Sequence, residues 1–169
     1  MKLFVISKKT ASLKQIEIQQ ICNLKNTFWK FGIRSQKIWF KKNVKKSFIH
    51  NIIKINNEIS AYTMLRDYTC HINNIKKKYY LFDTLIVKKK YRKSSITKKI
   101  MKLNSKIIKQ KKVHSLLFCN KKKKEFYEIY KWKELSKKNY KIHNFKTKKT
   151  LMIFNYLIKK GDKIEYKIR

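Results

Sequence analysis

The sequence predicts an α+β fold in which helices flank one mixed central sheet, and three observations lead to this prediction. Its 169 residues fit one compact domain, which we assign to residues 1–169. Hydrophobic residues make up 43% of the chain and aromatic residues 14%, which is enough to build a core. Two Asn-Asn pairs separate apolar runs that are rich in β-branched residues, and amphipathic segments lie before and after these runs.

The first third of the chain predicts a strand followed by two helices. Leu3–Ile6 is a short apolar strand. Apolar residues then recur near helical spacing over Leu13–Phe28, and Ser12 is a suitable N-cap for that helix. A second helix is expected after Ser35, and it carries the apolar residues of Ile38–Val44.

The middle of the chain predicts a three-stranded antiparallel meander. The chain has no proline and two glycines, so asparagine must form many of its turns. Asn56-Asn57 joins the runs His50–Ile55 and Glu58–Arg66 as a hairpin, and Asn73-Asn74 marks a second turn before Tyr79–Val87. These three runs are therefore expected to be consecutive strands of the sheet.

The last third predicts a helix and further strands. Apolar residues at helical spacing from Ile96 to Ile108 indicate a clear amphipathic helix. The later elements are expected to be a strand at Ser115–Cys119, a short helix at Glu125–Tyr130, a strand start at Trp132–Leu135 and a strand at Leu151–Leu157. The segment after Gly161 shows no pattern that predicts an element.

The charge of the chain is strongly positive. Lys and Arg total 46 against 9 Asp and Glu, a formal charge of +37, and 42 of the basic residues are lysine. Lys, Ile and Asn together make 79 residues and share A/T-rich codons, so we interpret much of the charge as drift in base composition. Non-specific association with nucleic acid is still expected from such a charge.

Composition also argues against several classes of protein. The longest apolar stretches have about four residues, far fewer than the ~20 that a membrane-spanning helix needs. The three cysteines are dispersed and form no CxxC pair, so neither a disulfide framework nor a metal site is predicted. We therefore expect a cytoplasmic protein with no membrane span and no bound metal.

A basic loop between a strand and a helix is the first candidate site. The strand Phe82–Val87 runs into Tyr91–Thr97, which opens the amphipathic helix. Such a junction directs backbone N–H groups and the positive end of the helix dipole toward one point, which suits a pyrophosphate. Arg92 and Lys93 add positive charge there.

These segments resemble the GNAT superfamily of N-acetyltransferases. Tyr91–Thr97 is similar to the acetyl-CoA loop of that family, whose pattern is Arg/Gln-x-x-Gly-x-Gly/Ala. Asn120, followed seven residues later by Tyr127 and then by Lys131-Trp132, is similar to its Asn-x6-Tyr motif. The order of elements from Leu3 to about Phe154 is also that of the family.

The resemblance implies a GNAT fold, acetyl-CoA as cofactor, and acetyl transfer to a primary amine of a small molecule or an amino sugar. It implies that the cofactor is bound by Leu85, Ile86, Val87, Arg92, Lys93, Ser94, Ser95, Ile96, Thr97 and Asn120. The backbone of Leu85–Val87 would pair with the pantetheine arm, so the Ser115–Cys119 strand would have to splay away from it. Tyr127 would be the general acid that protonates the CoA thiolate.

Asp83 is the one acidic residue in its apolar strand. Because a buried unpaired carboxylate is costly, we expect it to be either the general base or a hydrogen-bonded anchor. The bland alternative for Tyr127 is a core aromatic residue, and for Asn120 a turn residue.

Two departures keep a second function open. Ser95 and Thr97 stand where the family has glycines, and both are bulkier near the phosphates. The loop is then a basic connection capped by Ser94 or Ser95. The alternative is a non-catalytic or nucleic-acid-binding basic protein on a degenerate GNAT fold.

Overall fold

The computed structural model describes residues 2–92, 94–143 and 146–168. The chain divides into two compact units. The first unit comprises Met1–Arg66 and Asp83–Asn104, and the second comprises Asp67–Phe82 and Ser105–Arg169. Two long strands and one helix contribute residues to both units.

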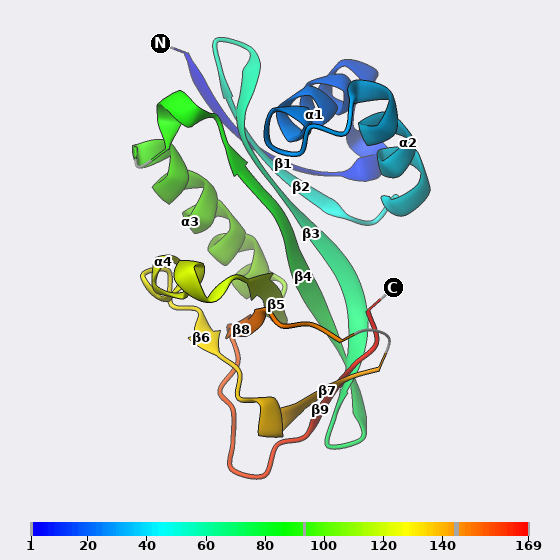
Figure 1. Ribbon diagram of the computed structural model, residues 1–169, viewed down its shortest axis with the longest axis vertical. Helices are drawn as coiled ribbons and strands as arrows, with labels where there is room; N and C mark the ends of the chain where they lie inside the picture. The colour runs from blue at the N-terminus through cyan, green and yellow to red at the C-terminus, as the bar shows by residue number, and fades with distance from the viewer. Residues whose placement is uncertain (1, 93, 144–145, 169) are drawn as a thin grey trace. The chain divides into compact units, whose positions relative to one another are not determined.

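The described residues form a nine-stranded mixed sheet (Figure 1). Its strands are β1 (Leu3–Lys9), β2 (Ile49–Ile55), β3 (Glu58–Ile72), β4 (Ile75–Val87), β5 (His114–Cys119), β6 (Lys133–Glu134), β7 (Tyr140–Ile142), β8 (Thr150–Phe154) and β9 (Ile164–Tyr166). Hydrogen-bonded neighbours follow the order β1-β2-β3-β4-β5-β8-β6, and β9 pairs with β3 and β7. The β4–β5 and β7–β9 pairs are parallel, whereas β1–β2, β2–β3 and β5–β8 are antiparallel. This confirms the α+β prediction.

The helices are α1 (Gln15–Phe28), α2 (Ile33–Asn43), α3 (Ser95–Gln110) and the short α4 (Lys124–Glu128). The expected N-cap at Ser12 is wrong, because Ser12 ends a 3₁₀ turn and α1 begins at Gln15. Helix α2 begins two residues before Ser35, and its C-cap is Val44. Strands β7 and β9 were not expected from the sequence.

Both Asn-Asn turns are confirmed. Asn56 and Asn57 have φ angles of 50° and 65°, and Asn73 and Asn74 have φ angles of 49° and 66°. Two successive residues with positive φ make the type I′ turn that suits the twist of a hairpin. Asparagine adopts this left-handed conformation more readily than other non-glycine residues, which explains how a chain with two glycines closes β2–β3 and β3–β4 tightly.

In the first unit, helices cover both faces of the sheet (Figure 1). Successive residues of β2 point to opposite faces. The His50 ring stacks on Phe40 of α2 at 5.7 Å, whereas the Asn51 amide donates to Asn104 of α3 at 2.8 Å. One core cluster on the α3 side contains Ile53, Ile55, Ala61, Val87, Ile96 and Ile100.

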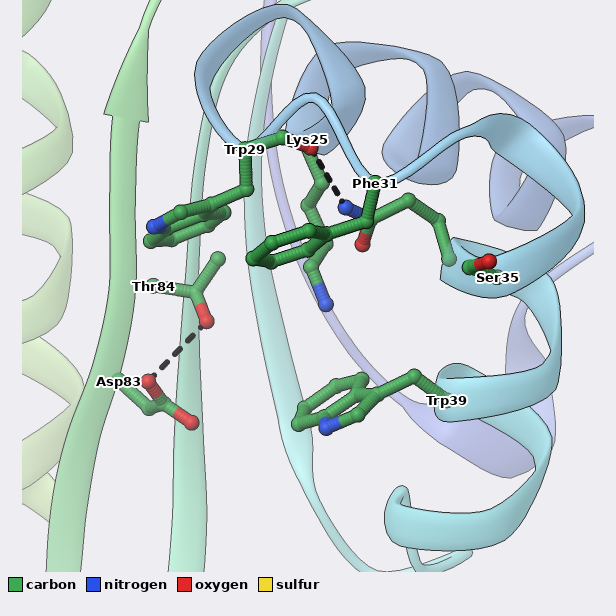
Figure 2. Close-up of a pocket in the computed structure, with 8 residues that line it drawn as sticks. Lys25, Trp29, Phe31, Ser35, Trp39, Asp83 and Thr84 are labelled. Carbon is green, nitrogen blue, oxygen red and sulfur yellow. Dashed lines mark hydrogen bonds between the residues drawn. The ribbon is translucent and has the colours of Figure 1, made fainter.

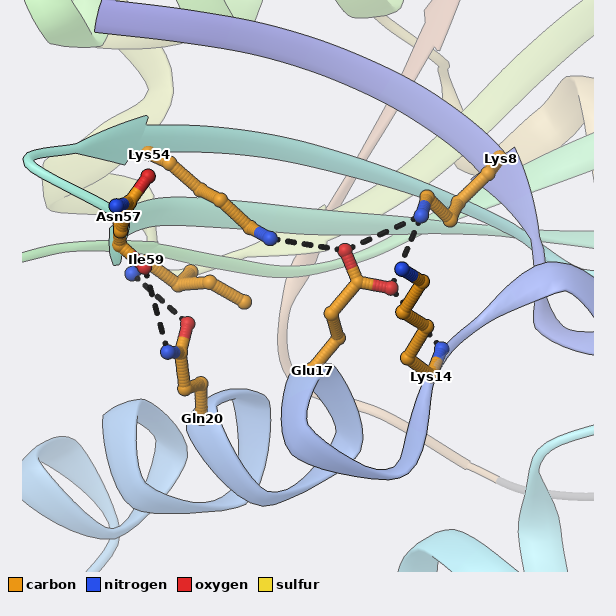
Figure 3. A network of polar contacts seen from close by, with 7 residues as sticks. All are labelled: Lys8, Lys14, Glu17, Gln20, Lys54, Asn57 and Ile59. Carbon is orange, nitrogen blue, oxygen red and sulfur yellow. Dashed lines mark hydrogen bonds and ion pairs between the residues drawn. The ribbon is translucent and has the colours of Figure 1, made fainter. Parts of the chain in front are cut away.

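A buried carboxylate fixes α1 to two neighbouring strands, β1 and β2 (Figure 3). Glu17 accepts a hydrogen bond from the backbone N–H of Lys14 at 3.0 Å. It also forms ion pairs with Lys8 of β1 and Lys54 of β2, each at 2.9 Å. Glu17, and not Ser12, is therefore the residue whose side chain makes the capping hydrogen bond at the start of α1.

In the second unit, β5 lies between β4 and β8. Five residue pairs join β5 to β8, from Ser115↔Phe154 to Cys119↔Thr150. The parallel ladder with β4 has three pairs, from Tyr79↔His114 to Leu81↔Leu116. Across the described residues, no helix is both long and apolar enough to span a bilayer.

Candidate functional site

A pocket of about 410 Å³ opens in the first unit (Figure 2). This volume is typical of sites for small ligands. Residues of α1, α2, the connection between them and β4 line it: Lys25, Trp29, Phe31, Ser35, Gln36, Trp39, Asp83 and Thr84. Three of the eight are aromatic, and two carry opposite charges.

The connection between α1 and α2 forms one wall of the pocket. Gly32 takes φ +85°, a conformation that favours glycine, and its N–H donates to the Asn26 side chain at 2.9 Å. The Gln36 amide donates to the carbonyl oxygen of Trp29, also at 2.9 Å. These bonds tie the connection to both helices, so Trp29 and Phe31 are presented by a braced segment.

Thr84 is a strained residue within β4. It has φ +61°, an unusual conformation for a β-branched side chain and one that costs ~1–3 kcal/mol. Strain of this kind concentrates at functional sites. The Thr84 hydroxyl donates to Asp83 Oδ1 at 3.1 Å, so the distortion lies beside the acidic residue that the sequence singled out.

Asp83 lies at the pocket wall with its carboxylate held in place. Its Oδ2 atom accepts from Arg66 Nη1 at 3.4 Å, and its side chain is 31% exposed. The carboxylate is thus ion-paired on one side and accessible on the other. This geometry allows it to hold a cationic ligand group.

Lys25 is a functional candidate that sequence reasoning missed. The residue is 5% exposed, and its Nζ atom lies 3.6 Å from the centre of the Trp39 ring. Burial lowers the pKa of the Lys25 ammonium, and the charge of Asp83 acts in the opposite direction. One lysine among 42 gives no signal in the sequence.

The loop between β4 and α3 is closed by hydrogen bonds of its own. Arg92 Nε donates to the carbonyl oxygen of Val87 at 3.1 Å. The Ser94 hydroxyl donates to the carbonyl oxygen of Tyr91 at 2.6 Å and accepts from the N–H of Ile96 at 3.2 Å. Ser94 is therefore the residue that caps α3. Lys93, which the resemblance also implicated, lies outside the described residues.

Ser95 and Thr97 occupy helical positions in the first turn of α3. Neither has a positive φ, so the backbone there does not need glycine. Ser95 is exposed and Thr97 half-buried, while Ile96 between them is buried in the core. Exposed basic residues surround this helix end: Lys89, Lys90, Arg92, Lys98 and Lys99.

The second unit carries the other predicted residues. Asn120 is exposed after β5, where its carbonyl oxygen accepts from the Lys123 N–H at 2.7 Å, and its side chain makes no capping bond. Tyr127 of α4 packs edge-on against Phe82, Phe126 and Trp132, at 6.3, 5.0 and 6.4 Å between ring centres.

The titration of Tyr127 reflects this packing. Burial raises the pKa of its phenol to about 12, and an interaction with Cys119 adds to the shift. The phenol is therefore fully protonated near neutral pH and has a proton to give.

Comparison with known proteins gives a clear result at the level of structure. No family model matches the sequence, and no curated protein matches it. Among solved structures, an acyl-CoA N-acyltransferase from Pseudomonas aeruginosa is similar with a TM-score of 0.66 and 11% identity, over 90% of this chain and 97% of that one. An N-acetyltransferase, PaiA, from Thermoplasma acidophilum in complex with coenzyme A has a TM-score of 0.57 and 14% identity, over 92% and 100%.

A third similar structure bears the family name. It is a GCN5-related N-acetyltransferase from Kribbella flavida, with a TM-score of 0.64 and 11% identity, over 79% of this chain and 34% of that one. The chain has the GNAT fold. This confirms the fold that the resemblance implied.

The GNAT fold of this chain brings part of the predicted site together within one unit. Asp83, the end of β4, Arg92 and the first turn of α3 all belong to the first unit, together with the pocket. Asn120 and Tyr127 belong to the second unit, where α4 follows β5 closely. Lys25, Trp29 and Trp39 are additions from the structure.

Proposed function

We propose that the chain is an acetyl-CoA-dependent N-acetyltransferase acting on a primary amine of a small molecule, in which residues 1–169 work as one domain. The observation that carries the proposal is the course of strand β4. It places the accessible Asp83 carboxylate at a pocket of a size for small ligands, and it leads on to the exposed, basic start of α3. The three similar solved structures described above are named as N-acyltransferases or N-acetyltransferases, and one of the three holds coenzyme A. The buried free thiols of the three cysteines fit a cytoplasmic enzyme.

The cofactor is proposed to bind at the end of β4 and the start of α3. The pyrophosphate lies at the helix N-terminus near the positive side chain of Arg92, and Lys93 is proposed as a contact from the resemblance alone. The backbone of Leu85–Val87 pairs with the pantetheine arm, and this segment of β4 lies beyond its three-pair ladder with β5. Asn120 holds the same arm through its side-chain amide.

The acceptor amine is proposed to bind in the pocket beside Asp83. The carboxylate accepts a hydrogen bond from the ammonium and acts as general base, which leaves a neutral amine. The amine nitrogen attacks the thioester carbonyl carbon, and the carbon–sulfur bond then breaks. Tyr127 gives its proton to the departing sulfur, and positioning of the two substrates supplies much of the acceleration.

Calorimetric titration tests the proposal first at the cofactor. Acetyl-CoA and CoA should both bind the purified protein, because most of their contacts are to the shared pantetheine and pyrophosphate. Release of CoA thiol on adding a primary amine then reports transfer. Lack of acetyl-CoA binding at millimolar concentration contradicts the proposal.

The second candidate function is nucleic-acid binding on a GNAT fold without catalysis. It is favoured by the +37 charge and by the Ser94 cap, which uses a backbone N–H that would otherwise face a phosphate. Scarce arginine argues against a dedicated role, because arginine favours base and phosphate recognition. Tight RNA binding together with no acetyl-CoA binding would support this candidate.

A further inference from the structure

Two oppositely charged side chains face the same pocket without pairing with each other. Asp83 forms its ion pair with Arg66. The contact of the Lys25 ammonium is with the face of Trp39, and no carboxylate among the described residues forms an ion pair with it. Figure 2 shows the Lys25 side chain reaching down toward the ring of Trp39, with Asp83 on the opposite side of the pocket.

The Lys25 ammonium is buried without a direct ion pair among the described residues. Lys25 is only 5% exposed. A buried charge costs free energy unless it pairs with an opposite charge. The charge of Asp83, which is shared with Arg66, and the aromatic face of Trp39 compensate only part of this cost. An anionic group that entered the pocket would supply the missing partner.

The net charge around the pocket also favours a ligand with an anionic group. Lys25 and Arg66 bring two positive charges to this region, and Asp83 brings one negative charge. A ligand that carries only an ammonium would meet a net positive site. A ligand that also carries a carboxylate would balance it.

We infer that the acceptor is an amino acid with a free carboxylate and an apolar or aromatic side chain. The inference rests on the proposed function for the fate of its amine. The amine lies beside Asp83, the carboxylate pairs with Lys25, and the side chain packs against Trp29 and Phe31.

The aromatic wall supports the last part of this assignment. Phe31 is 73% exposed, although the chain brackets it with hydrogen bonds at Trp29 and Gly32. Phe31 lines the pocket, and pockets for small ligands are lined mainly by hydrophobic and aromatic side chains. An apolar ligand side chain would cover it.

Binding can be measured without acetyl-CoA by quenching of tryptophan fluorescence, because Trp29 and Trp39 line the pocket. The probes are phenylalanine, phenethylamine, which lacks the carboxylate, and 3-phenylpropionate, which lacks the amine. Phenylalanine should bind at least tenfold more tightly than either. Trp39→Phe leaves Trp29 in the pocket and so shows how much of the quenching comes from Trp39. Trp132 belongs to the second unit.

Lys25→Met should remove the preference for phenylalanine over phenethylamine, because it keeps an unbranched apolar chain against Trp39 and removes the charge. The control is Lys37→Met, an exposed lysine of α2, which should leave the preference unchanged. The comparison of probes on the parent protein stands even if the Lys25 variant does not fold.

Outcomes separate this inference from the proposed function. Phenylalanine binding without acetylation would overturn the proposed function and leave the amino-acid site standing. Equal binding of phenylalanine and phenethylamine, no binding of either at millimolar concentration, or an unchanged preference in Lys25→Met would overturn the inference. Acetylation of phenethylamine at the rate of phenylalanine would overturn it as well, while supporting the proposed function.

Discussion

Arg92 Nε donates a hydrogen bond to the carbonyl oxygen of Val87 at 3.1 Å. The bond spans five residues and links the last residue of β4 to the loop that opens α3. It fixes the direction in which the loop leaves the sheet. It also occupies one of the backbone acceptors at the end of the strand proposed to meet pantetheine.

Arg92→Ala should weaken acetyl-CoA binding about tenfold. It removes the hydrogen bond that the Arg92 guanidinium donates to Val87, and it removes a positive charge near the proposed pyrophosphate site. Calorimetric titration measures the change. Arg34→Ala, which removes an exposed arginine of α2, is the matched control and should bind as the parent does. Equal affinity for Arg92→Ala and the parent would remove Arg92 from the site.

Ser95 tests the polarity of the helix start. Ser95→Gly should preserve or improve acetyl-CoA affinity, since it reduces bulk at an exposed first-turn position, whereas Ser95→Glu should weaken it by opposing the phosphates. Gln110→Glu places the same new charge at the far end of α3 and should change the affinity little. Dissociation constants for the three variants decide the point, and a harmless Ser95→Glu would exclude phosphate from this helix end.

Tyr127→Phe removes one hydroxyl and keeps the ring among its aromatic neighbours. We expect kcat to fall ~10²–10⁴-fold, the usual loss for a positioned acid, with little change in acetyl-CoA affinity or melting temperature. Tyr130→Phe is the control and should turn over near normally. A normal kcat for Tyr127→Phe on an identified amine would leave Tyr127 a packing residue.

The Glu17 network predicts a loss of stability in acid. Burial alone would raise the pKa of Glu17, but the Lys14 backbone N–H and the Lys8 and Lys54 ammonium groups outweigh it and hold the pKa at about 2 instead of its ordinary 4.5. A depressed folded-state pKa stabilises the fold above the unfolded pKa, and this contribution disappears as pH falls from 4.5 toward 2. It amounts to about 3 kcal/mol at neutral pH.

Urea unfolding at pH 7 and at pH 3 measures this contribution. Glu17→Gln should lower the free energy of unfolding by about 3 kcal/mol at pH 7 and by clearly less at pH 3. Glu128→Gln removes an exposed carboxylate and should stay within about 0.5 kcal/mol of the parent at both values. A pH-independent effect of Glu17→Gln would show that packing, not ionisation, makes the difference.

Salt separates the lysine-rich surface from the cofactor site. Nucleic-acid association, followed by fluorescence anisotropy, should be independent of sequence and fall steeply with salt. Acetyl-CoA binding should persist at a salt concentration that abolishes this association, because the loop N–H groups are directional and partly shielded. A preferred nucleic-acid sequence that survives high salt would favour the second candidate function.

Local rules predicted much of the fold. The two Asn-Asn turns and the amphipathic α3 follow from residue type and spacing, and both are present. The cap of α1 was missed because the N-cap residue is Lys14, a type not preferred at that position, and Glu17 at the third helical position accepts from the Lys14 backbone N–H. Strands β7 and β9 have three residues each, too short for a periodic signal.

The site divides in the same manner. The loop at Arg92 and the Asn120–Tyr127 spacing are readable because they lie within short stretches of chain. The positive φ of Thr84 is unusual for a β-branched residue, and the contact of Lys25 with Trp39 joins two helices, so neither follows from a local pattern. Nothing in the local sequence distinguishes Lys25 from the other lysines.

The hydrogen bond between Asn51 and Asn104 has a consequence at the far end of the helix. Asn104 also exchanges hydrogen bonds with Thr63 at 2.8 and 3.0 Å, so one side chain pins α3 to both β2 and β3. Ser95 lies nine residues up the helix, about 14 Å away at 1.5 Å per residue. A shift of the helix along the sheet would break all three buried hydrogen bonds. The position of the first turn of α3 along the sheet is therefore fixed by core residues before any ligand binds.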